Sequence, residues 1–295
     1  MALLITTIQQ GLIYAILGIG VYVSYKILDI PDLTAEGSFP LGALLVAKLI
    51  TSGVNPFIAT ILCFLIGSLA GLMTAIFHIK LKITGLLAGI LSMTILYSVN
   101  LHINGKPNVP LGRDTSLIFD LFKVGNSALS SILLLIIIVA IVKFTMDLFF
   151  KTEIGYMLLA TGDNETLVKA LGQRPEHYKI IGLMYSNGLI ALSGAIFAQL
   201  NRFADITMGV SIIVVALASI IIGQTILTHK KMHGSTRSII GAIIYRFIGA
   251  LALKLGFESM DLRMINGIIV VLFIAYNNAL ATYHIKRFLK RRNNA

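Results

Sequence analysis

Long segments without a charged side chain are the feature that most constrains what this chain can fold into. They cover residues 1–25, 53–77, 83–105, 180–201, 206–228 and 264–283. Each has about the ~20 residues that an α-helix needs to cross the ~30 Å hydrocarbon core of a bilayer. Soluble domains are ~45–50% apolar and ~25% charged, whereas this chain is 57% hydrophobic and 13% charged. The sequence therefore predicts an all-α polytopic membrane protein and excludes a soluble, disordered or disulfide-rich chain.

The hydropathy pattern predicts about nine transmembrane helices, within limits of eight to ten. Their expected ranges are 3–28, 38–52, 56–79, 83–104, 127–150, 177–200, 207–228, 238–256 and 263–283. The range 38–52 is short for a crossing and follows a stretch from Pro31 to Pro40 that is rich in helix breakers. We therefore expect it to be a half-helix or a re-entrant piece, and 207–228 is a second candidate for a broken span.

Basic residues alternate between the two sets of loops. Most of the 24 Lys and Arg residues fall on one side, which carries Lys26, Lys80, Lys82, Lys143, the segment 151–179, Lys230, Lys231, Arg237 and the tail 284–295. Because cytoplasmic loops hold the excess of Lys and Arg, this side is predicted to be cytoplasmic, with the C-terminus inside and the N-terminus outside. The same rule explains the net charge of +11 without a nucleic-acid partner.

Two similar motifs indicate an internal repeat. Asp32-Leu33-Thr34 follows the first span and Asp205-Ile206-Thr207 follows the sixth, and the predicted topology puts them on opposite faces. That arrangement is typical of inverted repeats in transporters, here 5+4 or 5+5 spans; the alternative is two unrelated polar helix entries. The predicted organisation is one transmembrane permease domain, 1–295, with a first repeat at about 1–150, a cytoplasmic loop at 151–176, a second repeat at about 177–283 and a basic tail at 284–295.

Polar and charged residues near the predicted helix breaks are candidates for lining a translocation path. They are Asp32, Thr34, Glu36, Ser38, Asp205, Thr207 and Arg246. Ionisable residues inside a membrane are costly unless they are paired or line a cavity. Arg246 has three interpretations that the sequence leaves open: it lines the path, it pairs with an acid such as Asp147, or it extends to the interface from a span misplaced by one turn.

The longest polar insertion lies on the predicted cytoplasmic side and contains a short helix over 164–171. Asp163 or Asn164 caps it, and the negative charge of Glu165 stabilises its N-terminal end, where the helix dipole is positive. Its apolar residues are Leu167, Val168, Ala170 and Leu171, with Lys169 between them and Gly172 ending the helix. A helix of two turns is not stable alone, so it either binds another protein or packs on its own bundle.

Catalytic and metal-binding patterns are missing from the sequence. It has no G-x-x-x-x-G-K-[ST] phosphate-binding loop, no H-E-x-x-H and no G-x-S-x-G. His229 and His233 have metal-ligand spacing, but they lie in a basic loop without a nearby carboxylate, so we expect a solvated loop. The chain is predicted to be a non-enzyme with no catalytic residue, no metal site and no cofactor of its own.

Two stretches resemble a known family. ATGDNETLVKALG at 160–172, followed by HYK and GLMYSNGLIALSGAIFAQ, resembles the coupling loop and following helix of ABC importer permeases of the branched-chain amino acid and ribose type. ILDIPDLTAEGSFPLGALL at 27–45 is similar to permeases of tryptophan/tyrosine transport systems. The resemblance implies a bacterial cell-membrane subunit with a second permease copy as a homodimer, two ATPase subunits that bind ATP and Mg, and an extracytoplasmic substrate-binding protein.

These observations together predict a permease subunit of an ATP-driven importer. The path would carry a small solute, an aromatic or other hydrophobic amino acid by resemblance, and the 163–172 segment would couple it to the ATPases. The alternative is an ion- or proton-coupled secondary transporter with inverted repeats. Such carriers usually need carboxylates within their spans, and the predicted spans place none at mid-membrane.

Overall fold

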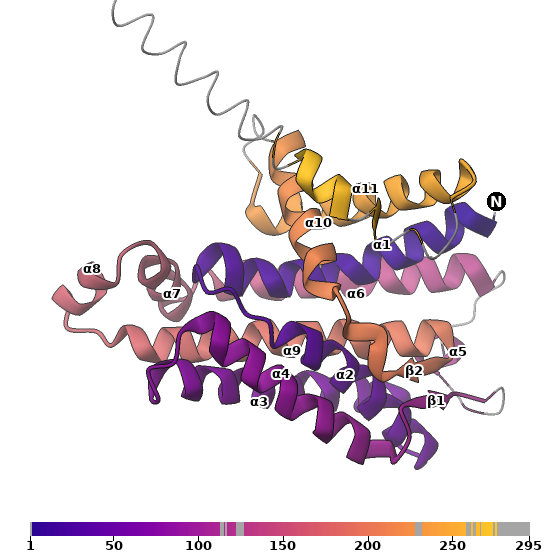
Figure 1. Cartoon of the computed structure of the whole chain (residues 1–295), viewed down its shortest axis with the longest axis horizontal. Helices are drawn as coiled ribbons and strands as arrows, with labels where there is room; N and C mark the ends of the chain where they lie inside the picture. The colour runs from indigo at the N-terminus through magenta and orange to yellow at the C-terminus, as the bar shows by residue number, and fades with distance from the viewer. Residues whose placement is uncertain are drawn as a thin grey trace, which may run out of the picture.

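The chain is described by a computed structural model that covers residues 2–112, 115, 117–121, 127–227, 232–257, 261, 264–265, 267–273 and 275. It is predominantly α-helical (Figure 1). The long helices are α1 (Ala2–Val21), α3 (Pro56–Ile79), α4 (Gly85–Asn104), α6 (Ser127–Phe149), α9 (Pro175–Asn201) and α11 (Gly234–Lys254). The shorter ones are η1 (Tyr22–Ile27, a π-helix), α2 (Ala35–Thr51), α5 (Ile118–Leu121), α7 (Glu153–Asp163), α8 (Glu165–Ala170), η2 (Ile206–Gly209) and α10 (Ile212–Ile226).

Seven helices in the described part of the chain are long and apolar enough to cross a membrane. They match seven of the nine predicted ranges, so the prediction of a polytopic helical membrane protein is confirmed. The range 38–52 corresponds to α2, which has 17 residues and is too short for a full crossing of ~30 Å at ~1.5 Å per residue. Most of the ninth range, 263–283, and the whole tail 284–295 lie outside the described residues.

Helix α9 lies at the centre of the bundle and packs against α1, α2 and α3, while α11 packs on α1 and α10 (Figure 1). Glycines allow these backbones to touch. A Cβ on Gly42 of α2 would overlap the carbonyl group of Ala191, and a Cβ on Gly71 of α3 would overlap that of Leu183. Gly67 and Gly71, four residues apart on α3, therefore both pack on α9 of the same chain.

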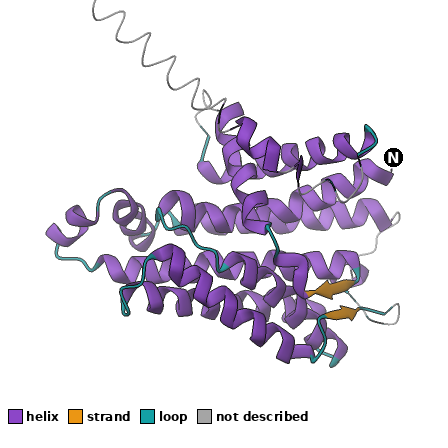
Figure 2. Ribbon diagram, viewed as in Figure 1, coloured by secondary structure: helices purple, strands orange, loops and turns teal. Residues whose placement is uncertain are grey.

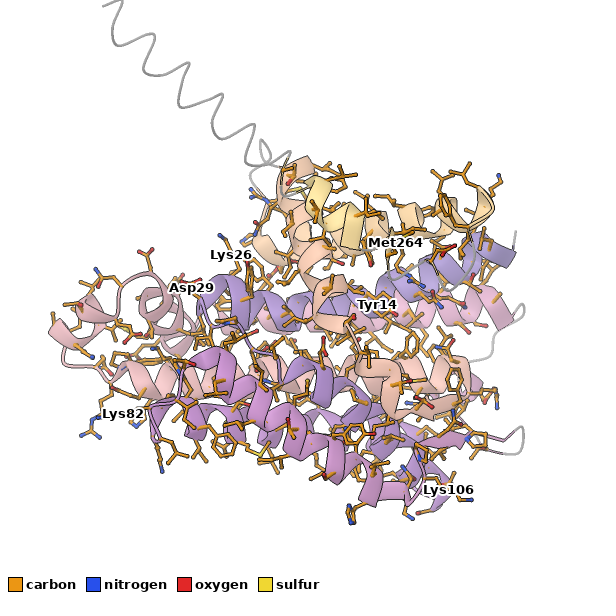
Figure 3. The ribbon with its side chains drawn as sticks, viewed as in Figure 1. Tyr14, Lys26, Asp29, Lys82, Lys106 and Met264 are labelled. Atoms are coloured by element: carbon orange, nitrogen blue, oxygen red, sulfur yellow. The ribbon has the colours of Figure 1, made fainter. Side chains whose placement is uncertain are left out.

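The two ends of the bundle differ in structure. At one end lie α7 and α8 together with Lys26 and Lys82, whereas Lys106 lies at the other end (Figure 3). That other end also carries the only sheet in the described residues (Figure 2). In it β1 (Asn108–Pro110) pairs antiparallel with β2 (Phe203–Asp205), and Asn108 lies opposite Asp205.

The predicted cytoplasmic loop contains more structure than the sequence analysis expected. Besides the short helix, α7 occupies eleven residues of it. The side chain of Thr152 accepts a hydrogen bond from the backbone N–H of Gly155 at 3.2 Å and so caps α7, and Glu153 sits in its first turn. Both are ordinary helix-start signals, so this helix was missed although the sequence contained its signal.

Candidate functional site

The first predicted helix break is present between η1 and α2. The chain leaves η1 at Ile27 and begins α2 at Ala35. Within this segment the Oδ1 atom of Asp32 accepts the backbone N–H of Thr34 at 3.0 Å. A carboxylate that accepts from the residue two positions on forms an Asx turn, and here the turn redirects the chain into α2.

The side chains around this break form a sealed polar network. Asn187, in the middle of α9, donates from Nδ2 to Asp32 Oδ2 at 2.7 Å and accepts from Ser38 Oγ at 2.7 Å. Thr34 and Thr74 of α3 share a hydrogen bond of 2.6 Å between their hydroxyls. Asp32 is 3% exposed and Thr34, Ser38 and Asn187 are fully buried. The network ties the start of α2 to α9, and in this structure its side chains do not face an open cavity.

The second predicted break repeats the same local turn. Oδ1 of Asp205 accepts the backbone N–H of Thr207 at 2.7 Å, and Oδ2 accepts Nδ2 of Asn108 at 3.0 Å. Partial burial raises the pKa of the Asp205 carboxyl, but the hydrogen bonds from Thr207 and Asn108 outweigh it and leave the pKa below its ordinary value. Asp205 therefore lies at the end of the bundle that bears Lys106, in a short sheet connected to η2.

Two of the predicted path residues, Glu36 and Thr207, line one pocket. Its volume is about 310 Å³, and it lies where the first turn of α2 meets η2 and the middle of α4. The backbone N–H of Ser211, which precedes α10, lies near the Glu36 carboxylate. Gly209 of η2 packs against the backbone of Glu36 so closely that a Cβ would overlap its carbonyl oxygen. The starts of the two short helices α2 and α10 thus meet at Glu36.

Glu36 lies in the first turn of α2, the short helix that the sequence analysis expected over 38–52. Between Glu36 and Thr51, at the far end of α2, the helix spans about 22 Å at ~1.5 Å per residue. The expectation that the spans hold no carboxylate at mid-membrane stays a prediction.

Arg246 is separate from this pocket. Its guanidinium lies 5.0 Å from the centre of the Tyr14 ring of α1, a cation–π contact. The suggested pairing with Asp147 is wrong, because Asp147 bonds Lys143 and the hydroxyl of Ser235 instead. Ser235 and Arg246 are eleven residues apart on α11, which separates them by about 16 Å along the helix axis.

The short helix predicted over 164–171 is present as α8, at the end of the bundle that carries Lys26 and Lys82 (Figure 1). Asn164, and not Asp163, caps it by accepting the backbone N–H of Leu167 at 3.1 Å. Val168 is fully buried, whereas Leu167 and Leu171 are 51% and 57% exposed. Lys169, Ala170 and Gly172 are also exposed. One apolar side chain therefore holds α8 on its own chain, and two leucines remain on its outer surface.

The helices α7 and α8 are fixed to the bundle through α7 and one ion pair. Gly162 of α7 packs directly on the carbonyl group of Ile27, where η1 ends. Leu158 of α7 is fully buried, and a Cβ on Gly182 of α9 would touch the side chains of Leu158 and Leu28. Glu165 of α8 pairs with Lys179 of α9. These contacts join α7 and α8 to Ile27 and Leu28, which precede the segment that contains Asp32.

Several residues of the site were not singled out from the sequence. Asn187 connects Asp32 to Ser38, and Asn100, Tyr97 and Thr94 line the Glu36 pocket. Amide side chains within apolar spans were the available signal, because a buried amide needs partners. No group of three or more His, Cys, Asp and Glu that could hold a metal occurs among the described residues; His229 lies outside them.

Comparisons with known proteins agree with this geometry. The family described as "Branched-chain amino acid transport system / permease component" matches residues 3–276. A tyrosine transport system permease protein of Clostridioides difficile is 45% identical over 93% of this chain and 91% of that protein. An uncharacterized protein of Rickettsia prowazekii is 37% identical over 94% of this chain and 98% of its own length. The ribose import permease protein RbsC of Haemophilus influenzae is 26% identical over 95% and 86%. The chain therefore belongs to this family of transport-system permeases and is a multi-pass membrane protein of bacteria.

Proposed function

We propose that this chain is the membrane subunit of an ATP-driven importer, and that two copies of it form the path for a small solute. The observation that carries the proposal is α8, which presents Leu167 and Leu171 to solvent on a helix of only six residues. So short a helix with exposed leucines is stable when it packs into a partner. In a transport permease without a phosphate-binding loop, the partner that this helix needs is an ATPase, which supplies the bound ATP and Mg.

The position of α8 supports this assignment. Lys26 and Lys82 lie at the same end of the bundle (Figure 3), and the excess of Lys and Arg marks the cytoplasmic side of membrane proteins. ATP is present in the cytoplasm, so an ATPase has to bind at this end. Lys106, β1 and β2 then lie on the outer side, where a substrate-binding protein delivers its cargo.

An inverted repeat supports alternating access through the bundle. Asp32 and Asp205 make the same turn before α2 and η2. The third α-helix of each half packs on the first α-helix of the other half, α3 on α9 and α11 on α1. Inverted halves of this kind place the path at their shared interface and allow rocking between two states. In the proposed mechanism the ATPases move α8 and α7, and this movement reaches α2 through the contact between Gly162 and Ile27.

The proposed cargo is an aromatic or other hydrophobic amino acid. Its support is the relative named as a tyrosine transport system permease, which is 45% identical over nearly the whole chain. The pocket beside Glu36 is large enough for part of such a molecule, at about 310 Å³, and Met93 and Tyr97 contribute to its wall.

One observation favours a second candidate function. Glu36 is a half-buried carboxylate in the first turn of α2, and carboxylates within membrane spans carry protons or ions in secondary transporters. In that case the chain would transport its cargo without an ATPase, driven by a proton or cation gradient.

Affinity purification of the tagged chain in mild detergent tests the two functions against each other. We expect an ATPase with a phosphate-binding loop to accompany the wild-type chain and to be lost from Leu167→Asp and Leu171→Asp. Leu81→Asp is a matched control, since Leu81 is 60% exposed but lies outside α8. A chain that purifies without an ATPase and transports in liposomes without ATP would refute the importer and establish the secondary carrier.

A further inference from the structure

One residue that lines the pocket between α2, α4 and η2 has a buried hydrogen-bond acceptor without a donor. Asn100 is fully buried on α4, and its Nδ2 donates to the carbonyl oxygen of Gly37 at 3.1 Å. This bond fixes the amide orientation, because only the NH₂ group can donate to a carbonyl. The remaining Oδ1 is buried and has no hydrogen-bond partner within the described part of the chain. A buried acceptor without a partner is rare in folded proteins and needs an explanation.

Glu36 adds a negative charge to the same pocket. A carboxylate has about four lone-pair positions that accept hydrogen bonds, and the backbone N–H of Ser211 lies near those of Glu36. No described residue that lines the pocket is Lys, Arg or His. The hydroxyl of Thr94 donates to the carbonyl oxygen of its own helix at Ile90, at 2.9 Å, so it too presents an acceptor. The pocket therefore offers acceptors and one negative charge to whatever enters it.

We infer that this pocket is a binding subsite for the primary ammonium group of a ligand with an apolar or aromatic body. An ammonium carries three donors and one positive charge, which matches the carboxylate of Glu36, and the buried Oδ1 of Asn100 adds an acceptor without a partner in the wall of the pocket. The body of the ligand lies against Met93 and Tyr97, which line the same pocket. The inference rests on the proposed function, because it makes Glu36 and Asn100 part of the path through which the solute passes.

The main competing ligands differ in what they would need from the pocket. A sugar has hydroxyls that both donate and accept, so it gains little from a lone carboxylate without a basic partner. An inorganic cation such as sodium prefers a shell of several oxygens, and it makes no use of the aromatic and thioether walls. An ammonium on an apolar body uses both the acceptors and the walls.

The test uses a reporter cysteine at the rim of the pocket. Thr94→Cys is introduced into the full-length chain, purified with its bound partners into lipid nanodiscs without nucleotide. Thr94 is exposed, whereas the native Cys63 is fully buried and so does not compete for a thiol reagent. The rate of labelling by a methanethiosulfonate is then measured with tyramine, with 4-ethylphenol, which lacks the ammonium group, and with sodium chloride.

Tyramine is expected to slow the labelling of the reporter, whereas 4-ethylphenol and sodium chloride at equal concentration are not. In Glu36→Gln, half-maximal slowing of the labelling should need about tenfold more tyramine or higher. This is the usual effect of losing a charge-assisted hydrogen bond. Glu153→Gln is the control, because Glu153 lies on α7, away from the pocket. If Glu36→Gln does not fold, Glu36→Asp decides: weakened but measurable protection by tyramine supports the subsite, and unchanged protection overturns it.

Three results overturn the subsite: equal protection by 4-ethylphenol, tyramine protection that persists in Glu36→Gln, or protection by sodium chloride alone. None of these measurements involves ATP, so they are independent of the purification test. A chain that retains its ATPase but shows no tyramine protection refutes the subsite and leaves the proposed importer in place. A chain that purifies without an ATPase refutes the importer whatever tyramine does.

Discussion

Replacing Gly162 by alanine is expected to disconnect α8 from the start of α2. A Cβ at this position would overlap the carbonyl oxygen of Ile27 and lie 2.7 Å from its carbonyl carbon, whereas ordinary contacts begin at 3.4 Å. The carbon atoms alone therefore require α7 and η1 to separate by at least about 0.7 Å, the difference between these two distances. To remove the overlap with the carbonyl oxygen, the separation has to be larger still. It then approaches the ~1–2 Å helix shifts that occur in switching proteins.

The loss of stability in Gly162→Ala is confined to the contact between α7 and η1. Over-packing of a close contact typically costs about 1–3 kcal/mol, and here the separation of α7 from η1 removes the overlap. Leu167 and Leu171 are untouched, so the ATPase should still bind. We therefore expect Gly162→Ala to keep its ATPase and to hydrolyse ATP without proportionate uptake of substrate.

The assay compares ATP hydrolysis with uptake in the same proteoliposomes. Gly249→Ala is the matched control, because a Cβ at Gly249 of α11 meets nothing within 4 Å. Both variants gain the same helix propensity, of about 1 kcal/mol, so their difference isolates the contact with Ile27. If Gly162→Ala transports as many molecules per ATP as the wild type, α7 does not transmit movement through η1 and the reasoning is refuted.

Three further substitutions test individual contacts. Asp32→Ala removes an acceptor from the Asn187 amide and should lower the free energy of unfolding by about 1–3 kcal/mol, seen as a lower Tm of the purified chain; an unchanged Tm contradicts the network. Arg246→Gln removes the cation–π contact with Tyr14, which is worth about 0.5–2 kcal/mol. It should therefore lower the Tm and leave the KM for uptake unchanged. A raised KM would instead put Arg246 in the path. Gly71→Ala forces α3 away from α9 and should lower the Tm more than Gly249→Ala does; equal Tm values would show that the contact is not close.

The positions of most spans could be predicted from the sequence because they are local properties. A charge-free run of sufficient length has to be helical in a membrane, since its backbone groups have no water to bond. The expected ranges 83–104 and 127–150 accordingly differ from α4 and α6 by one or two residues at an end. The cap and the end of α8 were predictable for the same reason, because Asn164 and Gly172 act within one helical turn.

The partners of the polar residues could not be predicted. Asp32 and Asn187 are separated by 155 positions, and only the glycine contacts that hold α9 against α2 and α3 bring them together. Glu36 shares a pocket with Thr207 because of where the segment after η1 runs in space. Hydropathy does not reveal that path. The sequence suggested an acidic partner for Arg246, such as Asp147, whereas in the structure its guanidinium lies over the aromatic ring of Tyr14.

ATP-driven uptake by the purified complex is the measurement that tests the central claim most directly. The complex is reconstituted into liposomes with ATP and Mg inside and with the extracytoplasmic binding protein and labelled tyrosine outside. We predict uptake that requires enclosed ATP, does not depend on a proton or sodium gradient, and is lost in Leu167→Asp but not in Leu81→Asp. Uptake that continues without ATP, or that Leu167→Asp leaves unchanged, would contradict a permease driven through α8.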